Sequence, residues 1–339
     1  MLEENTEYFE LLDEIKNSVV KTRNNIYEDA NKHLIMMYYN IGCKLIKNNK
    51  WGSSFIDTLA KDIKISFPTI KGMSARNLRY MQKFAKEYDN DEFLQEVLAK
   101  LSWNHNQMLM DKIKDVFVRR WYAKKTIENG WSTTVLAHEI GLKLYERQGI
   151  VNNKITNFDS TLPSPNNENV KELLKDPYIF DFISANEDLK ELEIEDALIS
   201  NITKLLLELG NGFAFIGRQY HLEIGNKDYY IDLLFYNLKV KSYVVIELKT
   251  TEFKPEYSGQ LNFYLSAIDK YVKGEDDNPS FGILLCREKD RITAELSLKD
   301  INKPIGVSEY KILSDIPEYL KEALPSIEDI EQRLDYMID

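Results

Sequence analysis

Residues 228–250, DYYIDLLFYNLKVKSYVVIELKT, have the pattern of two neighbouring strands that carry charged side chains within an apolar sheet. Apolar or aromatic residues occupy both alternating faces of each strand, which is typical of a sheet covered on both sides. In the first strand, Ile231, Leu233 and Phe235 are expected to share one face, and Asp232 lies on the other. An ionised side chain in such a strand is costly to bury unless it is paired or holds a metal ion.

Three charged side chains of this stretch are expected to meet at one place. Glu247 and Lys249 are two residues apart in the second strand, so both project from one face, beside Asp232 on the neighbouring strand. Two neighbouring carboxylates repel each other unless a cation lies between them, and their oxygens suit Mg²⁺ or Mn²⁺. Lys249 could then orient or deprotonate a water molecule, or stabilise charge on a phosphate. The alternative is a structural salt bridge between Lys249 and one of the carboxylates.

The same residues resemble the signature of a nuclease superfamily. Asp232, a gap of fourteen residues and then Glu247-Leu248-Lys249 match the D-(x)n-E-x-K pattern of the PD-(D/E)XK nucleases. Ile231 stands where that superfamily often has proline, a position that varies among its members.

A second motif follows in residues 255–269, PEYSGQLNFYLSAID. Gln260 and Tyr264 resemble the Q-x-x-x-Y element of the RecB-like branch of the superfamily, and they lie one turn apart on one face of an expected helix. The runs GFAFIGRQYHLEI, IDLLFY, VVIELK and DNPSFGILLC are similar to the YhcG family of nucleases. This resemblance extends into the N-terminal half and covers most of the chain.

The resemblance implies a fold, an activity and partners. The fold would be α/β and restriction-endonuclease-like, with a mixed sheet flanked by helices, preceded by an all-α N-terminal domain. The activity would be that of a divalent-metal-dependent DNA endonuclease that uses Mg²⁺ or Mn²⁺, on branched or structured DNA in recombination, repair or defence. The alternative is a non-cleaving, nucleic-acid-binding or defence-complex scaffold subunit with a nuclease-like fold. By analogy with nucleases that pair to cut both strands, we expect a homodimer.

The resemblance also implies roles for the residues of both motifs. Asp232 and Glu247 would hold the metal, and Lys249 would assist the attacking water. Gln260 and Tyr264 would position the lysine or the phosphate of the nucleic acid backbone.

Further site residues are expected from the elements that precede the first motif. Related nucleases often add a metal-binding glutamate from the helix before the first strand, here residues 194–209, IEDALISNITKLLLEL. Glu195 and Glu208 flank the apolar stripe of this helix on opposite sides. Glu195 is the first choice and Glu208 the alternative, and either could be a plain surface acid. Arg218 and Gln219, at the end of the first strand, would contact a DNA strand.

Composition is that of an ordinary water-soluble protein with room for two cores. The 339 residues are 43% hydrophobic and 29% charged. The N-terminal residues lack a basic region followed by an apolar run, and no stretch has the roughly 20 apolar residues that span a bilayer, so we expect no secretory signal and no membrane partner. Cys43 and Cys286 form no disulfide or zinc pattern, which favours the cytoplasm.

The net charge of −11 is unevenly distributed along the chain. Residues 1–160 contain 24 basic and 21 acidic residues, whereas residues 161–339 contain 20 and 34. Within the first part, residues 61–125 contain 14 basic and 8 acidic residues. A basic half that holds phosphates and an acidic half that carries a cation site would suit a nuclease. The alternative is that these charges are solvated surface residues.

The N-terminal half has helical periodicity, with two helices expected as a hairpin between Leu2 and Ile46. After an extended break at Phe67-Pro68, Ser74 is an expected N-cap of the next helix. Four cations of that helix are 3, 4 and 3 positions apart, so they share a face that would contact DNA in a helix-turn-helix-like arrangement. They are Arg76, Arg79, Lys83 and Lys86. The alternative is a solvated helix face.

The expected domain boundary lies where the composition changes. Residues 151–169 are rich in Asn, Ser and Pro and lack periodicity, so they are expected to form a linker. A helical domain would then occupy residues 1–150 and the nuclease domain residues 170–339. Within the latter, strands are expected at 281–286, parallel to the sheet, and at 305–312, followed by two helices.

Overall fold

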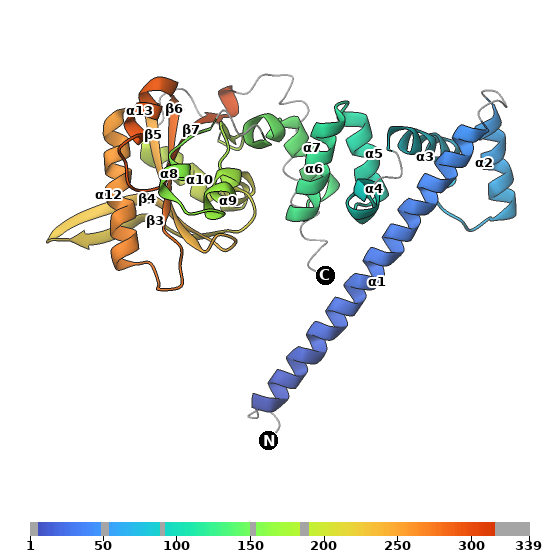
Figure 1. The fold of residues 1–339 in the computed structure, drawn as a ribbon, viewed down its shortest axis with the longest axis horizontal. Helices are drawn as coiled ribbons and strands as arrows, with labels where there is room; N and C mark the ends of the chain where they lie inside the picture. Colours follow the sequence, from blue (N-terminus) through green and yellow to red (C-terminus); the bar gives the residue numbers. More distant parts are fainter. Residues whose placement is uncertain (1–5, 49–53, 89–91, 150–153, 184–189, 316–339) are drawn as a thin grey trace. The chain divides into compact units, whose positions relative to one another are not determined.

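The computed structural model describes residues 6–48, 54–88, 92–149, 154–183 and 190–315 (Figure 1). The chain divides into two compact units, Met1–Ala137 and His138–Asp339. Each unit is described by itself. The two helices expected near the C-terminus fall at 316–339, outside the described residues.

In the part of the first unit that the structure describes, all regular elements are helices, which confirms the all-α prediction for these residues. They are α1 (Thr6–Lys47), α2 (Phe55–Ser66), α3 (Ala75–Glu87), α4 (Glu92–Glu96), the 3₁₀ helix η2 (Leu98–Lys100), α5 (Trp103–Lys112) and α6 (Val116–Asn129), and the division between the units falls within α7 (Thr133–Gly141). The expected hairpin between Leu2 and Ile46 is wrong, because α1 is one continuous helix. No proline interrupts residues 6–47, and the first glycine of the helix is Gly42.

The core of the first unit lies where the second half of α1 crosses α3. Tyr38 and Leu45 of α1 pack with Leu78 and Met81 of α3. At Gly42 the two helices approach so closely that an added Cβ would collide with the backbone carbonyl of Met81. Glycine at this position therefore allows the crossing.

The basic helix forms as the sequence indicates. Ser74 caps α3 by accepting a hydrogen bond from the backbone N–H of Asn77. The buried residues of α3 are the expected apolar stripe, Leu78, Met81, Phe84 and Ala85. Residues 67–74 separate α2 from α3. A helix, a break and a basic helix are present, and a helix-turn-helix-like role in DNA binding stays a prediction.

The second unit is a mixed sheet with helices on both faces, as expected. Its elements after α7 are the π-helical turn η3 (Tyr145–Gly149), β1 (Ile155–Thr156), α8 (Phe158–Thr161), α9 (Asn166–Leu173), β2 (Tyr178–Phe180), α10 (Glu191–Ser200), α11 (Ile202–Leu209), β3 (Phe213–Ile224), β4 (Lys227–Asn237), β5 (Ser242–Glu252), α12 (Pro255–Tyr271), β6 (Phe281–Glu288), α13 (Arg291–Leu298), β7 (Ile305–Ile312) and η5 (Leu313–Asp315). The sheet order is β1-β7-β6-β5-β4-β3, and β2 also pairs with β7. The strands β5, β6 and β7 are parallel, whereas β3, β4 and β5 form antiparallel hairpins.

The predicted linker differs from the structure. Ile155 and Thr156 form β1, which pairs antiparallel with β7, and Phe158 lies in the core of the second unit. The side chain of Asn157 donates to the carbonyls of Ile301 and Lys303 and accepts from the backbone N–H of Ile305. Asn157 thus makes tertiary hydrogen bonds within the second unit. The composition of residues 151–169 does not reveal these bonds, because asparagine side chains also bond to nearby backbone in linkers.

Two cores lie on opposite faces of the sheet. One lies beneath α10 and α11 and includes Leu233 and Phe235; the other lies beneath α12 and α13 and includes Ile231 and Leu234. The expectation that Ile231 shares a face with Leu233 is therefore wrong. Strict alternation fails at Asp232, and Gln219, which lies opposite it on β3, has a positive φ of 46°.

Two further observations concern membranes and thiols. Among the described residues, no helix has both the length and the apolar character needed to cross a bilayer. Cys43 and Cys286 are both free thiols.

Candidate active site

The site forms where β4 and β5 separate. Backbone pairing between them extends from the turn only to Leu233 and Ile246. One step beyond, the Oδ2 atom of Asp232 accepts a hydrogen bond from the backbone N–H of Leu248, at 2.9 Å. The Oε1 atom of Glu247 accepts one from the backbone N–H of Asp232, at 3.4 Å. Side chains thus replace backbone carbonyls in the ladder, and these bonds fix both carboxylates in place.

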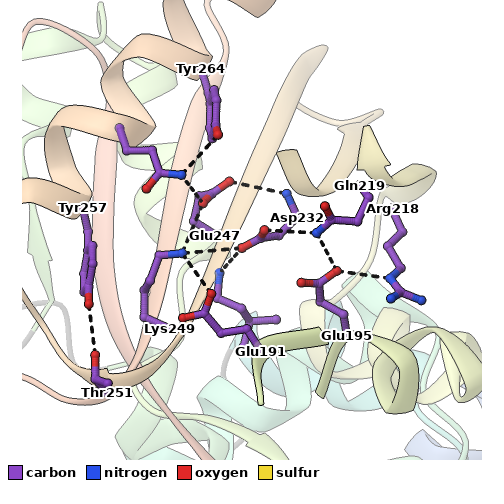
Figure 2. Close-up of polar contacts among 12 residues, drawn as sticks. Glu191, Glu195, Arg218, Gln219, Asp232, Glu247, Lys249, Thr251, Tyr257 and Tyr264 are labelled. Atoms are coloured by element: carbon purple, nitrogen blue, oxygen red, sulfur yellow. Dashed lines mark hydrogen bonds and ion pairs between the residues drawn. The ribbon is translucent and has the colours of Figure 1, made fainter. Parts of the chain in front are cut away.

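Lys249 lies between the acidic side chains, as the strand spacing predicts (Figure 2). Its Nζ atom is 3.6 Å from Oε2 of Glu247 and 4.0 Å from Oδ2 of Asp232. The Lys249 side chain is only 10% exposed, and its ammonium also lies 5.5 Å from the centre of the Tyr257 ring. The three residues of the first motif therefore converge.

Burial and mutual repulsion favour the protonated forms of the two acids. Burial raises the pKa of Asp232 to about 6, against the lowering effect of the Leu248 N–H and of Lys249. Burial and the neighbouring Asp232 raise the pKa of Glu247 well above its usual value. Burial alone would lower the pKa of Lys249, but the surrounding carboxylates outweigh it and raise that pKa. Lys249 is therefore an ammonium. Its single positive charge faces the carboxyl groups of both Asp232 and Glu247.

Glu195 reaches this cluster from α10 through an amide. Its Oε2 atom accepts hydrogen bonds from Nε2 of Gln219, at 2.9 Å, and from Nε of Arg218, at 3.1 Å. The same Gln219 nitrogen lies 3.3 Å from Oδ1 of Asp232, so one carboxamide joins Glu195 to Asp232. Arg218 also pairs with Asp196. Both residues expected to contact DNA thus contact carboxylates of the site (Figure 2).

The alternative ligand, Glu208, lies elsewhere. The expected single helix is interrupted at Asn201, where α10 ends and α11 begins. Glu208 is buried and accepts hydrogen bonds from Arg147 at 2.5 Å, from Lys175 at 3.3 Å and from the backbone N–H of Ile179 at 2.8 Å. Glu208 therefore anchors β2 and the segment around Arg147, and it does not join the carboxylate cluster.

The second motif approaches from the opposite face of the sheet. On α12, Nε2 of Gln260 lies 3.4 Å from Oε2 of Glu247 and donates to the hydroxyl of Tyr264 at 3.1 Å. Burial raises the pKa of the Tyr264 hydroxyl, so it stays protonated near neutral pH. Gln260 therefore contacts the same Glu247 oxygen as Lys249, and Tyr264 holds the Gln260 amide.

Sequence reasoning missed Glu191. Its Oε2 atom lies 3.4 Å from Nζ of Lys249. Glu191 and Glu195 are four residues apart on α10, so both project toward the sheet from one helix face. That spacing was the available signal.

The donor set can be tested for its fit to a hard divalent cation. Asp232 and Glu247 are 13% and 1% exposed, hold adjacent carboxylates, and share one ammonium. Such oxygens suit Mg²⁺ or Mn²⁺. Across the described ranges, however, no three side chains of His, Cys, Asp or Glu already form a metal-binding group. The carboxylates of Asp232 and Glu247 therefore fit a divalent cation. Because the Gln219 amide lies between Glu195 and Asp232, Glu195 could act as a third ligand only after Gln219 moves.

The basic face of α3 is partly neutralised by acids of the same unit. Arg79 pairs with Asp57 at 2.6 Å. Lys83 donates to the carbonyl of Met110 at 3.0 Å and lies 3.3 Å from Asp111. Arg76 and Lys86 are exposed, and the guanidinium of Arg76 lies 5.8 Å from the Tyr80 ring. An open cavity of about 400 Å³ is lined by Arg76, Arg79, Tyr80, Lys83 and Asp111.

Two family models match this chain in succession. Residues 14–147 match the DUF1016 N-terminal domain, and residues 171–325 match the YhcG PDDEXK nuclease domain. The chain is 26% identical over 340 residues to the protein named "Putative nuclease YhcG" of Escherichia coli (strain K12), with 90% of each chain covered.

Similar solved structures cover a smaller share of the chain. A repair endonuclease from Pyrococcus abyssi has 18% identity and a TM-score of 0.27, covering 39% of this chain and 50% of that one. An EndoMS–dsDNA2 complex gives the same identity and TM-score, covering 40% and 51%. The chain thus spans about half the length of these solved structures.

The segment that matches the nuclease model contains Asp232, Glu247, Lys249, Gln260 and Tyr264, the residues on which the resemblance was first based. The resemblance to the YhcG family is confirmed over both halves of the chain, of which the first matches the DUF1016 N-terminal domain and the second the YhcG PDDEXK nuclease domain.

Proposed function

We propose that this chain is a divalent-metal-dependent DNA endonuclease. The observation that carries the proposal is a pair of carboxylates, the half-buried Asp232 and the buried Glu247. Backbone N–H groups hold both where β4 and β5 separate, and the Lys249 ammonium lies beside them. A pair of acids with raised pKa values beside a lysine is the kind of site that hydrolyses phosphodiesters with a bound cation. The match to a nuclease domain supports the same reaction class.

Each residue has a role that its contacts support. Asp232 and Glu247 would hold Mg²⁺ or Mn²⁺, with Glu195 as a third ligand once Gln219 leaves it. When bound, the cation would supply a Lewis acid for the phosphate and a more acidic water. Lys249 would orient that water or stabilise charge on the phosphate. Gln260 and Tyr264 would keep the Glu247 carboxylate in position.

Contact of Arg218 and Gln219 with a DNA strand would require an exchange of partners. Both side chains now donate to Glu195. A phosphate could replace that carboxylate as the acceptor for Arg218, since a guanidinium binds both groups in the same way. We propose that Arg218 and Gln219 turn toward the DNA when Glu195 turns toward the cation.

The activity is tested with a panel of DNA substrates. Linear duplex, nicked, flapped and four-way-junction DNA would be incubated with Mg²⁺, with Mn²⁺ and with a chelator. We expect strand cleavage that requires the cation, with faster cleavage of branched than of linear DNA. Equal cleavage of all four substrates would contradict only the expected preference for branched DNA. Cleavage in the presence of chelator would contradict the requirement for a divalent metal.

Asp232→Asn is expected to stabilise the protein without metal and to abolish its response to metal. Because the pKa of Asp232 is about 6 in the folded protein and 3.8 otherwise, the parent loses stability as pH rises between these values. In chelator above that range the variant should be more stable, by about 1–3 kcal/mol. Millimolar Mg²⁺ or Mn²⁺ should raise the melting temperature of the parent only. A parent that melts at the same temperature with and without both ions would remove the support for the metal site.

The double variant Arg76→Ala/Lys86→Ala is expected to weaken DNA binding across sequences. Arg76 and Lys86 are exposed cations of the α3 face, whereas Arg79 and Lys83 already have acidic partners. Each lost phosphate contact should reduce the slope of log K against log salt by about 1. Lys21→Ala/Lys32→Ala, which removes two exposed cations from α1, is the matched control. An unchanged slope in the α3 variant would show that this face is merely solvated.

A further inference from the structure

Lys249 contacts residues of two helices, α10 and α12, which cover opposite faces of the sheet (Figure 2). From the first turn of α10, Oε2 of Glu191 lies 3.4 Å from Nζ of Lys249. From α12, the ring of Tyr257 lies below the same ammonium, with its centre 5.5 Å away. The hydroxyl of Tyr257 contacts Oγ1 of Thr251 at 3.1 Å, which helps to fix the ring. The ammonium thus has two contacts in addition to the carboxylate pair.

These two contacts differ from the others around the carboxylate pair. Gln219 and Gln260 each donate a hydrogen bond to a carboxylate of the pair. Glu191 and Tyr257 instead contact the lysine. Because Tyr257 and Gln260 are three residues apart on α12, one helix face contacts both the ammonium and a carboxylate.

A bound divalent cation would change what holds Lys249 in place. Its Nζ atom now lies 3.6 Å from Glu247 and 4.0 Å from Asp232, whose negative charges attract it. A cation on these two carboxylates would neutralise that attraction and would repel the ammonium. The carboxylate of Glu191 and the electron-rich face of the Tyr257 ring would remain as attractive contacts. Without them, the flexible lysine would turn toward solvent.

The position of Glu191 suits this role. Its side chain is 39% exposed, whereas that of Glu247 is 1% exposed, so solvent reaches the Glu191 carboxylate. The first turn of a helix also favours a negative charge. Glu191 can therefore remain the anionic partner of Lys249 without taking part in binding the cation.

We propose that Glu191 and Tyr257 are positioning residues that keep the Lys249 ammonium at the carboxylate pair when a divalent cation is bound there. The proposal rests on the metal site and on the role of Lys249 proposed above. Glu191 would act through the lysine and would not be a ligand of the cation. Its loss should therefore affect the position of Lys249 only when the cation is present.

The first test follows the Lys249 side chain in the absence of DNA. The methylene group next to Nζ should give an NMR signal shifted by the ring current of Tyr257, observed in protein with ¹³C-labelled lysine and identified by its absence in Lys249→Arg. In chelator, the parent and Glu191→Gln should show the same shift. Millimolar Mg²⁺ should leave the shift in the parent and abolish it in Glu191→Gln. Tyr257→Leu should lack the shift in both conditions. A shift in Glu191→Gln that persists in Mg²⁺ would overturn the proposal.

Glu193→Gln is the matched control for this test. It removes one charge from the same turn of α10 but keeps a side-chain oxygen for the backbone N–H of Lys190, so the helix stays capped. Its Lys249 signal should respond to Mg²⁺ like that of the parent.

The melting temperature shows whether Glu191 is itself a ligand. Mg²⁺ should raise the melting temperature of Glu191→Gln about as much as that of the parent. The variant loses a negative charge near the cation, but the departure of the Lys249 ammonium removes a positive one. If the rise disappears in Glu191→Gln, Glu191 binds the cation directly and the proposal is wrong.

The last test measures cleavage of DNA at saturating Mg²⁺ under single-turnover conditions. Glu191→Gln and Tyr257→Leu should each be slower than the parent by about 10-fold. Tyr257→Phe keeps the ring and should retain most of the parent rate. A Tyr257→Phe variant as slow as Tyr257→Leu would contradict the role of the ring. A parent that cleaves no DNA would contradict the proposed function, whereas the NMR and melting results test the positioning of Lys249 without DNA.

Discussion

Lys249→Ala is expected to slow metal-dependent DNA cleavage at least about 100-fold, the usual scale for loss of a proton-transfer group or of a stabiliser of the transition state. The Lys249 ammonium lies 3.6 Å from Glu247 and 4.0 Å from Asp232, the two proposed metal ligands. It is a neighbour of the proposed ligands and has no lone pair to offer while protonated. DNA binding should therefore persist, and metal binding should be equal or tighter because the two acids lose their resident positive charge.

Two further variants sharpen this result. Lys249→Arg should not restore cleavage, because a guanidinium does not give up a proton and its planar donors point differently. Lys239→Ala, at an exposed lysine of the same unit, should cleave like the parent. Single-turnover cleavage with saturating metal provides the measurement. If Lys249→Ala cleaves as fast as the parent, the site does not carry the activity, and a non-cleaving scaffold becomes the better account of the fold.

Glu208→Ala is expected to lower the free energy of unfolding by about 3–5 kcal/mol, the cost of removing one partner from a buried ion pair. The variant leaves Arg147 and Lys175 facing one carboxylate fewer in a buried site, and the backbone N–H of Ile179 loses its acceptor. Chemical denaturation in chelator measures this loss. The response of the remaining folded protein to Mg²⁺ or Mn²⁺ should not change.

Glu195→Ala provides the opposite pattern. It removes a carboxylate from the neighbourhood of Asp232 and leaves Arg218 paired with Asp196, so stability in chelator should fall less than in Glu208→Ala, while the melting shift caused by metal should shrink. The two variants therefore distinguish a structural glutamate from a ligand. A Glu208 variant with normal stability and no metal response would reverse the assignment that the contacts support.

Local patterns predicted the elements that make the site. A Gly-Asn pair between two strands is typical of a two-residue hairpin turn, and Gly225-Asn226 between β3 and β4 has both residues at positive φ. β7 spans Ile305–Ile312, the expected range. The shared face of Glu247 and Lys249 also followed from strand periodicity, whereas Asp232 joins them at a point where the alternation of β4 fails. These features depend on turn chemistry and on side-chain alternation, which are encoded within a few residues.

Tertiary contacts decided the features that the sequence did not reveal. The segment around Asn157 has a linker-like composition, yet its side chain completes the edge of the sheet at Ile305. The helix before β3 breaks at Asn201, which separates Glu195 from Glu208 although both flank one apolar stripe in a straight helix. The sequence indicates Gln219 only as a contact for DNA, and its place opposite Asp232 makes it a bridge between two acids.

The carboxylates of Asp232 and Glu247 complete the hydrogen-bond ladder where β4 and β5 separate. Their state can therefore be followed through the backbone amides that donate to them. The amide of Leu248 donates to one acid and the amide of Asp232 donates to the other. Any event at a carboxylate, such as proton uptake, cation binding or amide replacement, alters the acceptor of a main-chain N–H. The chemical shifts and hydrogen-exchange rates of these two amides thus report on the state of the two carboxylates. A ligand at the carboxylates also changes the strength of the hydrogen bonds that join β4 to β5.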